Sequence, residues 1–166
     1  MRILVVDQAT INTAYNIIEI TEDKKVKWIC CSMIKIRQTE DTMFRINSLY
    51  EGLAEIIDEY NIDLMVLEEV PVSRRTNLHT TVVLLKLLGV LELLAVRKNI
   101  QVEIMNVNFW KKKAGITTRT RAEQKKQSIQ LALGRWKAYR DILVDNDDVA
   151  DALNMGYAFL KHKNYL

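Results

Sequence analysis

The sequence predicts an α/β protein with a mixed five-stranded sheet flanked by helices. An apolar, β-branched run over residues 2–7 ends in a carboxylate, which is typical of a buried strand. Segments 14–20 and 26–36 alternate partly between apolar and polar residues on either side of the charged turn 21–25. This pattern predicts an antiparallel hairpin beside the first strand. Farther along, helical and strand patterns alternate, as they do in crossover units that place strands parallel.

A change of spacing after the hairpin predicts the first helix. From Asp41 to residue 57 apolar residues recur every three or four positions, and either Asp41 or Thr42 can cap the resulting helix. The next apolar run, 62–70, carries acidic residues near its end and closes ahead of Pro71, the one proline of the chain. We interpret this run as a buried strand of the sheet.

Residues 81–98 predict a long helix that is apolar around most of its circumference. One stripe is enough to face a core, so the pattern implies a second buried face. The remaining predicted elements are a strand over 101–107 and helices over about 121–133 and 146–161.

Composition limits the classes of function. With 166 residues the chain has the size of one domain, and we expect a single domain over 1–166. Only 5 glycines and 1 proline are present, which excludes a glycine-rich phosphate loop.

Cys30 and Cys31 are adjacent and poorly placed to bond to each other, and the apolar stretch 82–96 is interrupted by Lys86 and Glu92. We therefore expect a cytoplasmic protein with no membrane partner.

Four acidic residues occupy places where carboxylates are unusual. Asp7 and Glu68 each end an apolar strand, and Asp148 and Asp151 lie three apart at the start of an apolar helix. Each alone could serve a turn, a cap or the solvent-facing surface. Together they predict a site, because neighbouring parallel strands end at the edge of the sheet where α/β proteins bind ligands. Oxygen ligands without His or Cys select Mg²⁺ or Mn²⁺, and a pair of such ions suits phosphoryl chemistry.

Basic residues are concentrated in two segments that flank these acids. Charge runs are often only solvated surfaces, but cations beside an acidic pocket are what a metal-dependent nuclease needs to hold a DNA backbone. Trp110, among the lysines, could stack on a base or anchor a loop in the core. The candidate DNA-binding residues are Arg74, Arg75, Lys111, Lys112, Lys113, Arg119, Arg121, Lys125 and Lys126.

Three segments, 7–14, 66–70 and 148–153, resemble in their order the motifs of the RuvC-type Holliday junction resolvases, which are members of the ribonuclease H-like superfamily. The last of them, Asp-Val-Ala-Asp-Ala-Leu, is the most specific. The first departs from the family pattern at Gln8, Ala9 and Ala14. Residues 71–73 follow the second segment where bacterial members carry an aromatic wedge.

The resemblance implies a homodimer that cuts symmetric strands of a four-way DNA junction and leaves 5′-phosphate and 3′-hydroxyl ends. Helix 81–98 would help to build the dimer interface. Lys125 or Lys126 would hold the scissile phosphate or its neighbour, and Asp147 is a rival of Asp148 because it lies four residues before Asp151. The implied metal ligands, for two Mg²⁺ that Mn²⁺ can replace, are Asp7, Glu68, Asp148 and Asp151.

The missing aromatic suggests a wider range of branched substrates, including three-way junctions, forks and flaps. In these departures from the family pattern the sequence also resembles small phage or viral resolvases.

Two other interpretations stay open. One is a non-catalytic protein that binds branched DNA, and the other is an actin- or sugar-kinase-like ATPase, which the lack of a second domain and of glycine-rich turns disfavours.

Overall fold

The computed structural model describes residues 1–72, 77–144 and 146–166. Its five-stranded sheet has the order β3-β2-β1-β4-β5. β2 pairs antiparallel with both β1 and β3, whereas β4 is parallel to β1 and β5 is parallel to β4. The predicted mixed sheet is therefore confirmed. The strands are β1 (Arg2–Asp7), β2 (Asn12–Ile20), β3 (Val26–Lys35), β4 (Leu64–Glu68) and β5 (Gln101–Met105).

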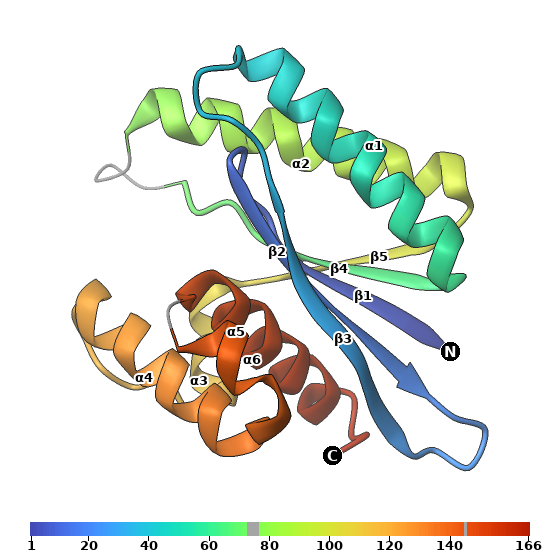
Figure 1. Cartoon of the computed structure of the whole chain (residues 1–166), viewed down its shortest axis with the longest axis vertical. Helices are drawn as coiled ribbons and strands as arrows, with labels where there is room; N and C mark the ends of the chain where they lie inside the picture. The colour runs from blue at the N-terminus through green and yellow to red at the C-terminus, as the bar shows by residue number, and fades with distance from the viewer. Residues whose placement is uncertain (73–76, 145) are drawn as a thin grey trace.

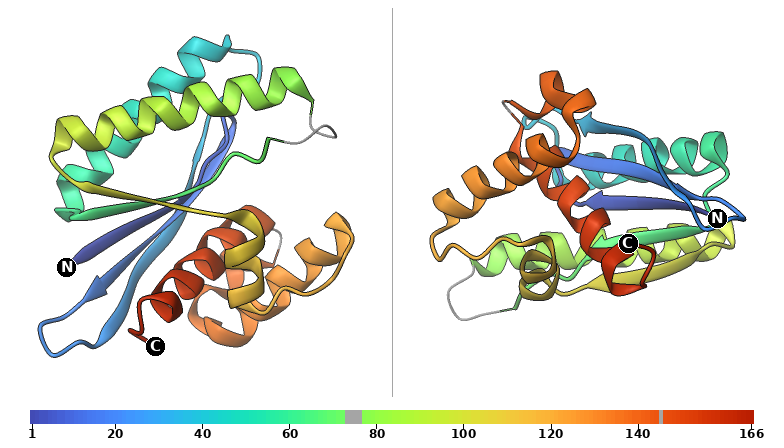
Figure 2. Two further views of the ribbon diagram at one scale, coloured as in Figure 1. Left: turned by 180° about the vertical axis from the view of Figure 1, so that it is seen from behind. Right: turned by 90° about the horizontal axis from the view of Figure 1, so that it is seen from below.

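Helices cover both faces of the sheet. α1 and α2 lie on one face, and α3, α4 and α6 lie on the other (Figures 1 and 2). β1 is buried on both sides, because Leu4 and Val6 pack in the core under α1 and α2 while Ile3 and Val5 pack in the core under α6. The helices are α1 (Thr42–Tyr60), α2 (Leu78–Lys98), α3 (Val107–Ala114), α4 (Arg121–Arg135), the short 3₁₀ helix η1 (Lys137–Tyr139), α5 (Arg140–Leu143) and α6 (Asp147–His162).

Local sequence signals explain where the helices begin. Asp41 caps α1 and accepts hydrogen bonds from the amides of Met43 and Phe44 at 2.8 and 3.0 Å, so of the two candidate caps Asp41 is used. α3 corrects the sequence interpretation of 101–107 as one strand. Its cap, Asn106, accepts from the amides of Asn108 and Phe109, and the helix begins at Val107.

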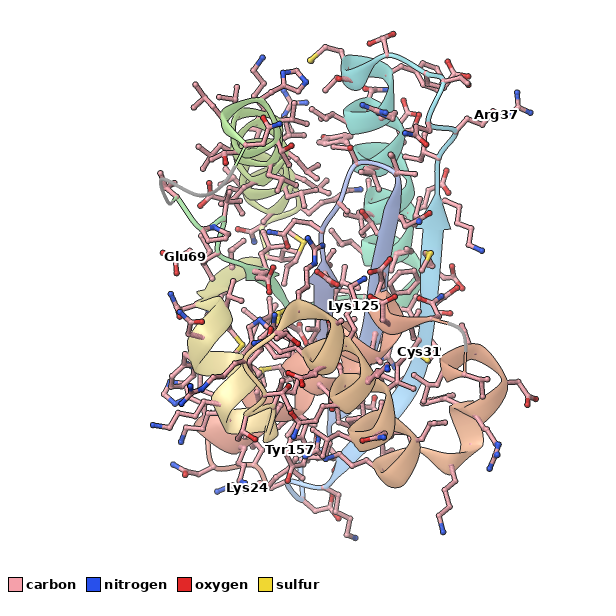
Figure 3. The ribbon with its side chains drawn as sticks, turned by 90° about the vertical axis from the view of Figure 1, so that its left-hand side faces the viewer. Lys24, Cys31, Arg37, Glu69, Lys125 and Tyr157 are labelled. Carbon is pink, nitrogen blue, oxygen red and sulfur yellow. The ribbon has the colours of Figure 1, made fainter. Side chains whose placement is uncertain are left out.

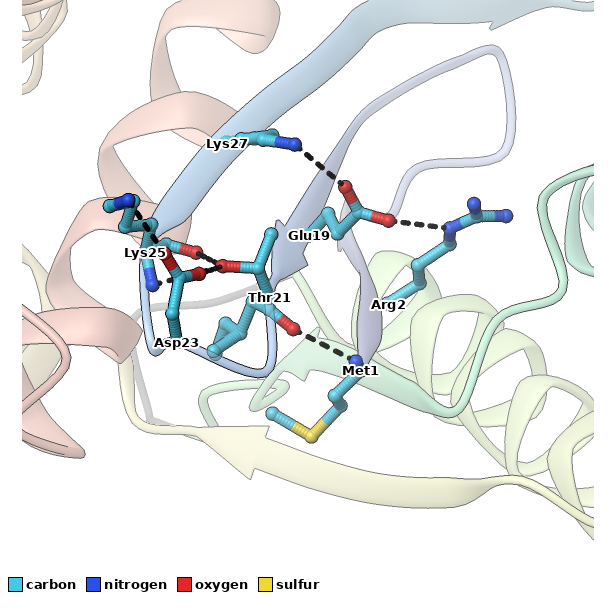
Figure 4. A network of polar contacts seen from close by, with 8 residues as sticks. Met1, Arg2, Glu19, Thr21, Asp23, Lys25 and Lys27 are labelled. Atoms are coloured by element: carbon cyan, nitrogen blue, oxygen red, sulfur yellow. Dashed lines mark hydrogen bonds and ion pairs between the residues drawn. The ribbon is translucent and has the colours of Figure 1, made fainter.

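Charged pairs surround the turn of the hairpin formed by β2 and β3. Glu19 lies between Arg2 and Lys27, with N–O separations of 3.3 and 3.8 Å (Figure 4). In the turn the Thr21 hydroxyl contacts Asp23, whose carboxylate pairs with Lys25 at 2.6 Å. Exposed contacts of this kind add little stability, and the hairpin predicted from the sequence is present.

Close packing of α6 on β2 fixes the position of the last acidic motif. A Cβ added to Gly156 would lie 2.9 Å from Ile18 and 3.0 Å from Asn16 Oδ1, so only glycine allows this approach. Asn16 is buried, and its Nδ2 donates to the Ala152 carbonyl at 2.7 Å. The start of α6 is thereby brought to the edge of the sheet where β1 ends.

α2 is buried on one side only. Leu87, Leu91 and Leu94 pack in the core under α1, whereas a second, exposed stripe is also apolar. By length and composition α2 could cross a membrane. Its other side packs in the core with α1 and the sheet. The sequence predicts a second buried face, and in the structure of the single chain this second face is apolar but exposed.

Candidate active site

Asp7 is placed at the carboxyl end of β1, opposite Ala14 of β2. Removal from water raises its pKa well above the usual range, and the charges of Glu68, Asp151 and Asp148 raise it further. The charge of Lys111 acts in the opposite direction. Acids from three distant segments are thus close enough to repel one another at the edge of the sheet.

Glu68 ends β4, beside Asp7, and both its side chain and its backbone are held. The indole Nε1 of Trp110 donates to Glu68 Oε1 at 2.7 Å. The Gln8 amide bonds to both backbone groups of Glu68: its Nε2 donates to the carbonyl, and its Oε1 accepts from the amide at 3.0 Å. Burial raises the pKa of Glu68, while the bond from Trp110 and the charge of Lys111 lower it.

Asp148 and Asp151 lie in the first turns of α6, which Asn146 caps. Asp151 accepts a hydrogen bond from the Ser128 hydroxyl of α4. Burial raises the pKa of both carboxyls, and for Asp151 the bond from Ser128 opposes that rise. Asp147 instead pairs with Lys125 of α4, which Figure 3 labels. The charge of Asp148 acts on Asp7 and Asp151, that of Asp147 acts on Asp151, and both residues line the cavity described next.

These acids line one cavity of about 690 Å³ together with part of the basic set. Its cationic lining consists of Lys111, Arg119, Arg121 and Lys125. Lys112, Lys113 and Lys126 are exposed and absent from that lining. The predicted DNA-binding residues Arg74 and Arg75 lie outside the residues that the structure describes.

Trp110 belongs to the core, with 1% of its surface exposed, so it cannot stack on a nucleotide base. Its position beside Glu68 shows a different use, as a hydrogen-bond donor to an acid of the cavity. Sequence reasoning missed the contacts of Gln8 and Ser128. The one sequence feature that pointed to a special role for Gln8 was its departure from the family motif directly after Asp7.

The donor set suits a hard divalent cation. In the described ranges no three His, Cys, Asp or Glu side chains lie close enough together to hold a metal ion as they stand. The same ranges hold no ion pair to Asp7, Glu68 or Asp151, although burial raises the pKa of all three. Carboxylate oxygens that repel one another in this way are the ligands that Mg²⁺ and Mn²⁺ prefer.

The mixed sheet, the helices on both faces and the acidic cavity with a basic lining define a nuclease of the ribonuclease H-like class. A family model described as crossover junction endodeoxyribonuclease RuvC matches residues 3–158. The chain belongs to this family, as its motifs predict.

Similar proteins come from bacteria and from a virus. The crossover junction endodeoxyribonuclease RuvC of Caldanaerobacter subterraneus subsp. tengcongensis is 26% identical over 166 residues, which are 100% of this chain and 96% of that protein. The structure of T. thermophilus RuvC in complex with Holliday junction substrate has a TM-score of 0.75 at 12% identity, covering 99% of this chain and 98% of that one. Fowlpox virus resolvase in complex with Holliday junction DNA has a TM-score of 0.70 at 20% identity, covering 98% and 99%.

Proposed function

We propose that this chain is a divalent-metal-dependent endonuclease that cleaves Holliday junctions and other branched DNA. Membership of the RuvC family supports the activity. The observation that carries the proposal is the cavity in which acids from β1, β4 and α6 lie beside cations from α3 and α4. Acids could hold metal while the cations hold phosphate, and a nuclease needs both.

We propose that Asp7, Glu68, Asp148 and Asp151 hold two Mg²⁺, which Mn²⁺ can replace. When bound, such a pair supplies an activated water and stabilises the departing 3′ oxygen. The protein positions these ligands through Trp110 and Ser128, each of which donates to one carboxylate.

The lysines that line the cavity have separate places. The charge of Lys111 lowers the pKa of Asp7, Glu68 and Asp151. Its Nζ donates a hydrogen bond to Gln124 Oε1 at 3.2 Å. Lys125 is held at the cavity by Asp147, which supports Lys125 rather than the exposed Lys126 as the contact of the scissile phosphate. A fixed ammonium acts there as a point charge on a phosphate oxygen.

We propose that two copies of the chain pair through α2. The exposed positions of α2 follow one stripe at helical spacing, with Lys86 and Glu92 on its two sides. Opposite charges that flank a self-complementary apolar stripe suit a two-fold interface. The stripe consists of Leu78, Val82, Leu85, Gly89, Leu93 and Val96.

The substrate range is expected to be wide. Pro71 lines the cavity and Val72 is exposed, and neither supplies an aromatic ring to insert into a junction centre. We propose that three-way junctions, forks and flaps are cut as well.

Cys30 and Cys31 are free thiols, which supports a cytoplasmic location. The phage or viral origin stays a prediction, because both bacterial and poxviral structures resemble the chain.

Incubation of the purified protein with labelled four-way, three-way, flap and linear DNA, with and without Mg²⁺, tests the function. We expect Mg²⁺-dependent cleavage of the branched DNAs only. Asp7→Asn should abolish cleavage while junction binding in Ca²⁺ persists. Binding without cleavage by the wild-type chain would favour the non-catalytic alternative, and equal cleavage of linear duplex would contradict the proposed selectivity.

A further inference from the structure

A series of hydrogen-bonded side chains that do not line the cavity connects Arg135 to Asp151. Arg135, near the end of α4, donates from Nη1 to Asn154 Oδ1 at 2.7 Å. Asn154 of α6 donates from Nδ2 to Ser128 Oγ at 2.9 Å. The Ser128 hydroxyl then donates to Asp151 Oδ1. Ser128 and Asn154 are fully buried, so the bond between them is not shared with solvent, whereas Arg135 and Asp151 are partly exposed.

In this series of hydrogen bonds, each bond determines which group donates in the next one. A guanidinium only donates, so Asn154 must turn its oxygen toward Arg135 and its NH₂ group toward Ser128. Because Ser128 Oγ accepts from that NH₂ group, its own hydrogen is available for Asp151.

Arg135 is itself fixed at the far end. Its Nη2 donates to the Ala114 carbonyl at 2.6 Å, and its guanidinium lies 3.9 Å from the ring centroid of Tyr157. A charged donor therefore stands at one end of the chain and a carboxylate at the other, and bonds aligned in this way polarise one another.

We propose that Arg135, Asn154 and Ser128 form a positioning relay that orients Asp151 for metal binding. The relay occupies Oδ1 and Asp151 itself lines the cavity, so Oδ2 is the oxygen left for a metal. This inference rests on the proposed metal-dependent function. None of the three relay residues lines the cavity, so they act through Asp151 and do not touch substrate.

The structure offers a variant that cuts the relay but keeps the helix packing. Asn154 Nδ2 also donates to the Ser128 main-chain carbonyl at 2.9 Å, and this bond survives in Ser128→Ala. Asn154→Asp is the second variant. It retains an acceptor for Arg135 but cannot donate to Ser128, which leaves the hydroxyl free to turn toward residue 154 and away from Asp151.

The test is Mn²⁺ binding to the full-length protein, followed by electron paramagnetic resonance of the free ion, with thermal unfolding recorded without metal. Loss of partners behind a metal ligand typically weakens metal binding about 10- to 100-fold, and we expect at least a tenfold loss in both variants. In cleavage assays the Mg²⁺ concentration for half-maximal rate should rise more than the rate at saturating Mg²⁺ falls. Ser48→Ala, which removes a hydroxyl bonded to Phe44 O on α1, is the control and should match wild type.

The possible results separate the relay from the function on which it rests. Wild-type Mn²⁺ affinity in Ser128→Ala would overturn the relay alone. Weaker binding that tracks a loss of folded protein in the unfolding curves would also overturn it, because the residues would then be structural only. A wild-type protein that binds Mn²⁺ no better than Asp7→Asn would overturn the proposed metal site, and the relay with it.

Discussion

Replacing Gln8 by methionine tests how the edge of the sheet is held at the active site. The β1–β4 pairing extends to Val6 and Leu67, and beyond it the Gln8 amide bonds to both backbone groups of Glu68. Gln8 is 8% exposed, so water replaces these bonds poorly. Methionine keeps the length of the side chain and removes both polar groups.

The loss of stability in Gln8→Met follows from the backbone amide and carbonyl of Glu68, which both lose their hydrogen-bond partner. A buried backbone group without a hydrogen bond costs about 1–3 kcal/mol, so two such groups cost about 2–6 kcal/mol. Because Gln8 lines the cavity, where water has partial access, we expect the lower part of this range, a fall of about 2–4 kcal/mol in the free energy of unfolding. For a chain of this size that corresponds to a fall of about 5–15 °C in Tm. Cleavage should fall further than stability explains, because a displacement of a catalytic group by about 1 Å can cost about 100-fold in rate.

Urea unfolding without DNA or metal measures the first effect, and single-turnover cleavage measures the second. Gln130→Met, at an exposed position of α4, is the matched control. A free energy of unfolding for Gln8→Met within about 0.5 kcal/mol of wild type, the range of ordinary surface substitutions, would refute the reasoning.

Four further predictions follow from the site and the packing. Asp148→Asn should reduce cleavage far more than Asp147→Asn under the same Mg²⁺ concentration, and equal losses would leave Asp147 as a ligand. Gly89→Glu should convert a dimer to a monomer in light scattering, because it places a charge within the exposed apolar stripe of α2. Gly156→Ala should lower the free energy of unfolding by about 1–3 kcal/mol in urea, because the added Cβ meets atoms at 2.9 and 3.0 Å. The pKa of Asp7 is raised in the folded protein, so ionisation of this carboxyl lowers the free energy of unfolding as the pH rises from its unfolded pKa to its folded pKa. Ca²⁺ binds the ionised form, so in calorimetry Ca²⁺ should raise Tm near neutral pH and have little effect at acidic pH.

Strand ends were the most readable part of the site in the sequence. Each acid alone has ordinary structural uses, but neighbouring parallel strands end at one edge of a sheet, so Asp7 and Glu68 together could be assigned to that edge. The spacing of Asp148 and Asp151 gave their shared helix face in the same way. What allowed these predictions is that each depends on periodicity within a single element.

Contacts between elements were not readable. α3 is too short for its periodicity to be distinguished from a loop, and its first residue was assigned to the preceding strand. The separation of Lys111, which lines the cavity, from the exposed Lys112 and Lys113 follows from the rotation of that helix. Gln8 could be recognised as unusual but not as a substitute for strand pairing, because its partner is 60 residues away.

The hydrogen bonds to the two best-held acids explain how a site can be rigid and still bind metal. In the described part of the chain, Trp110 donates to one oxygen of Glu68, and Ser128 donates to one oxygen of Asp151. Donors on both oxygens would compete with a cation for lone pairs, whereas no donor would leave each carboxylate free to rotate. One donor for each carboxylate restricts its direction and leaves an oxygen for the proposed metal. Under that proposal the cost of burying these charges falls on the metal-free protein, and metal binding would relieve it.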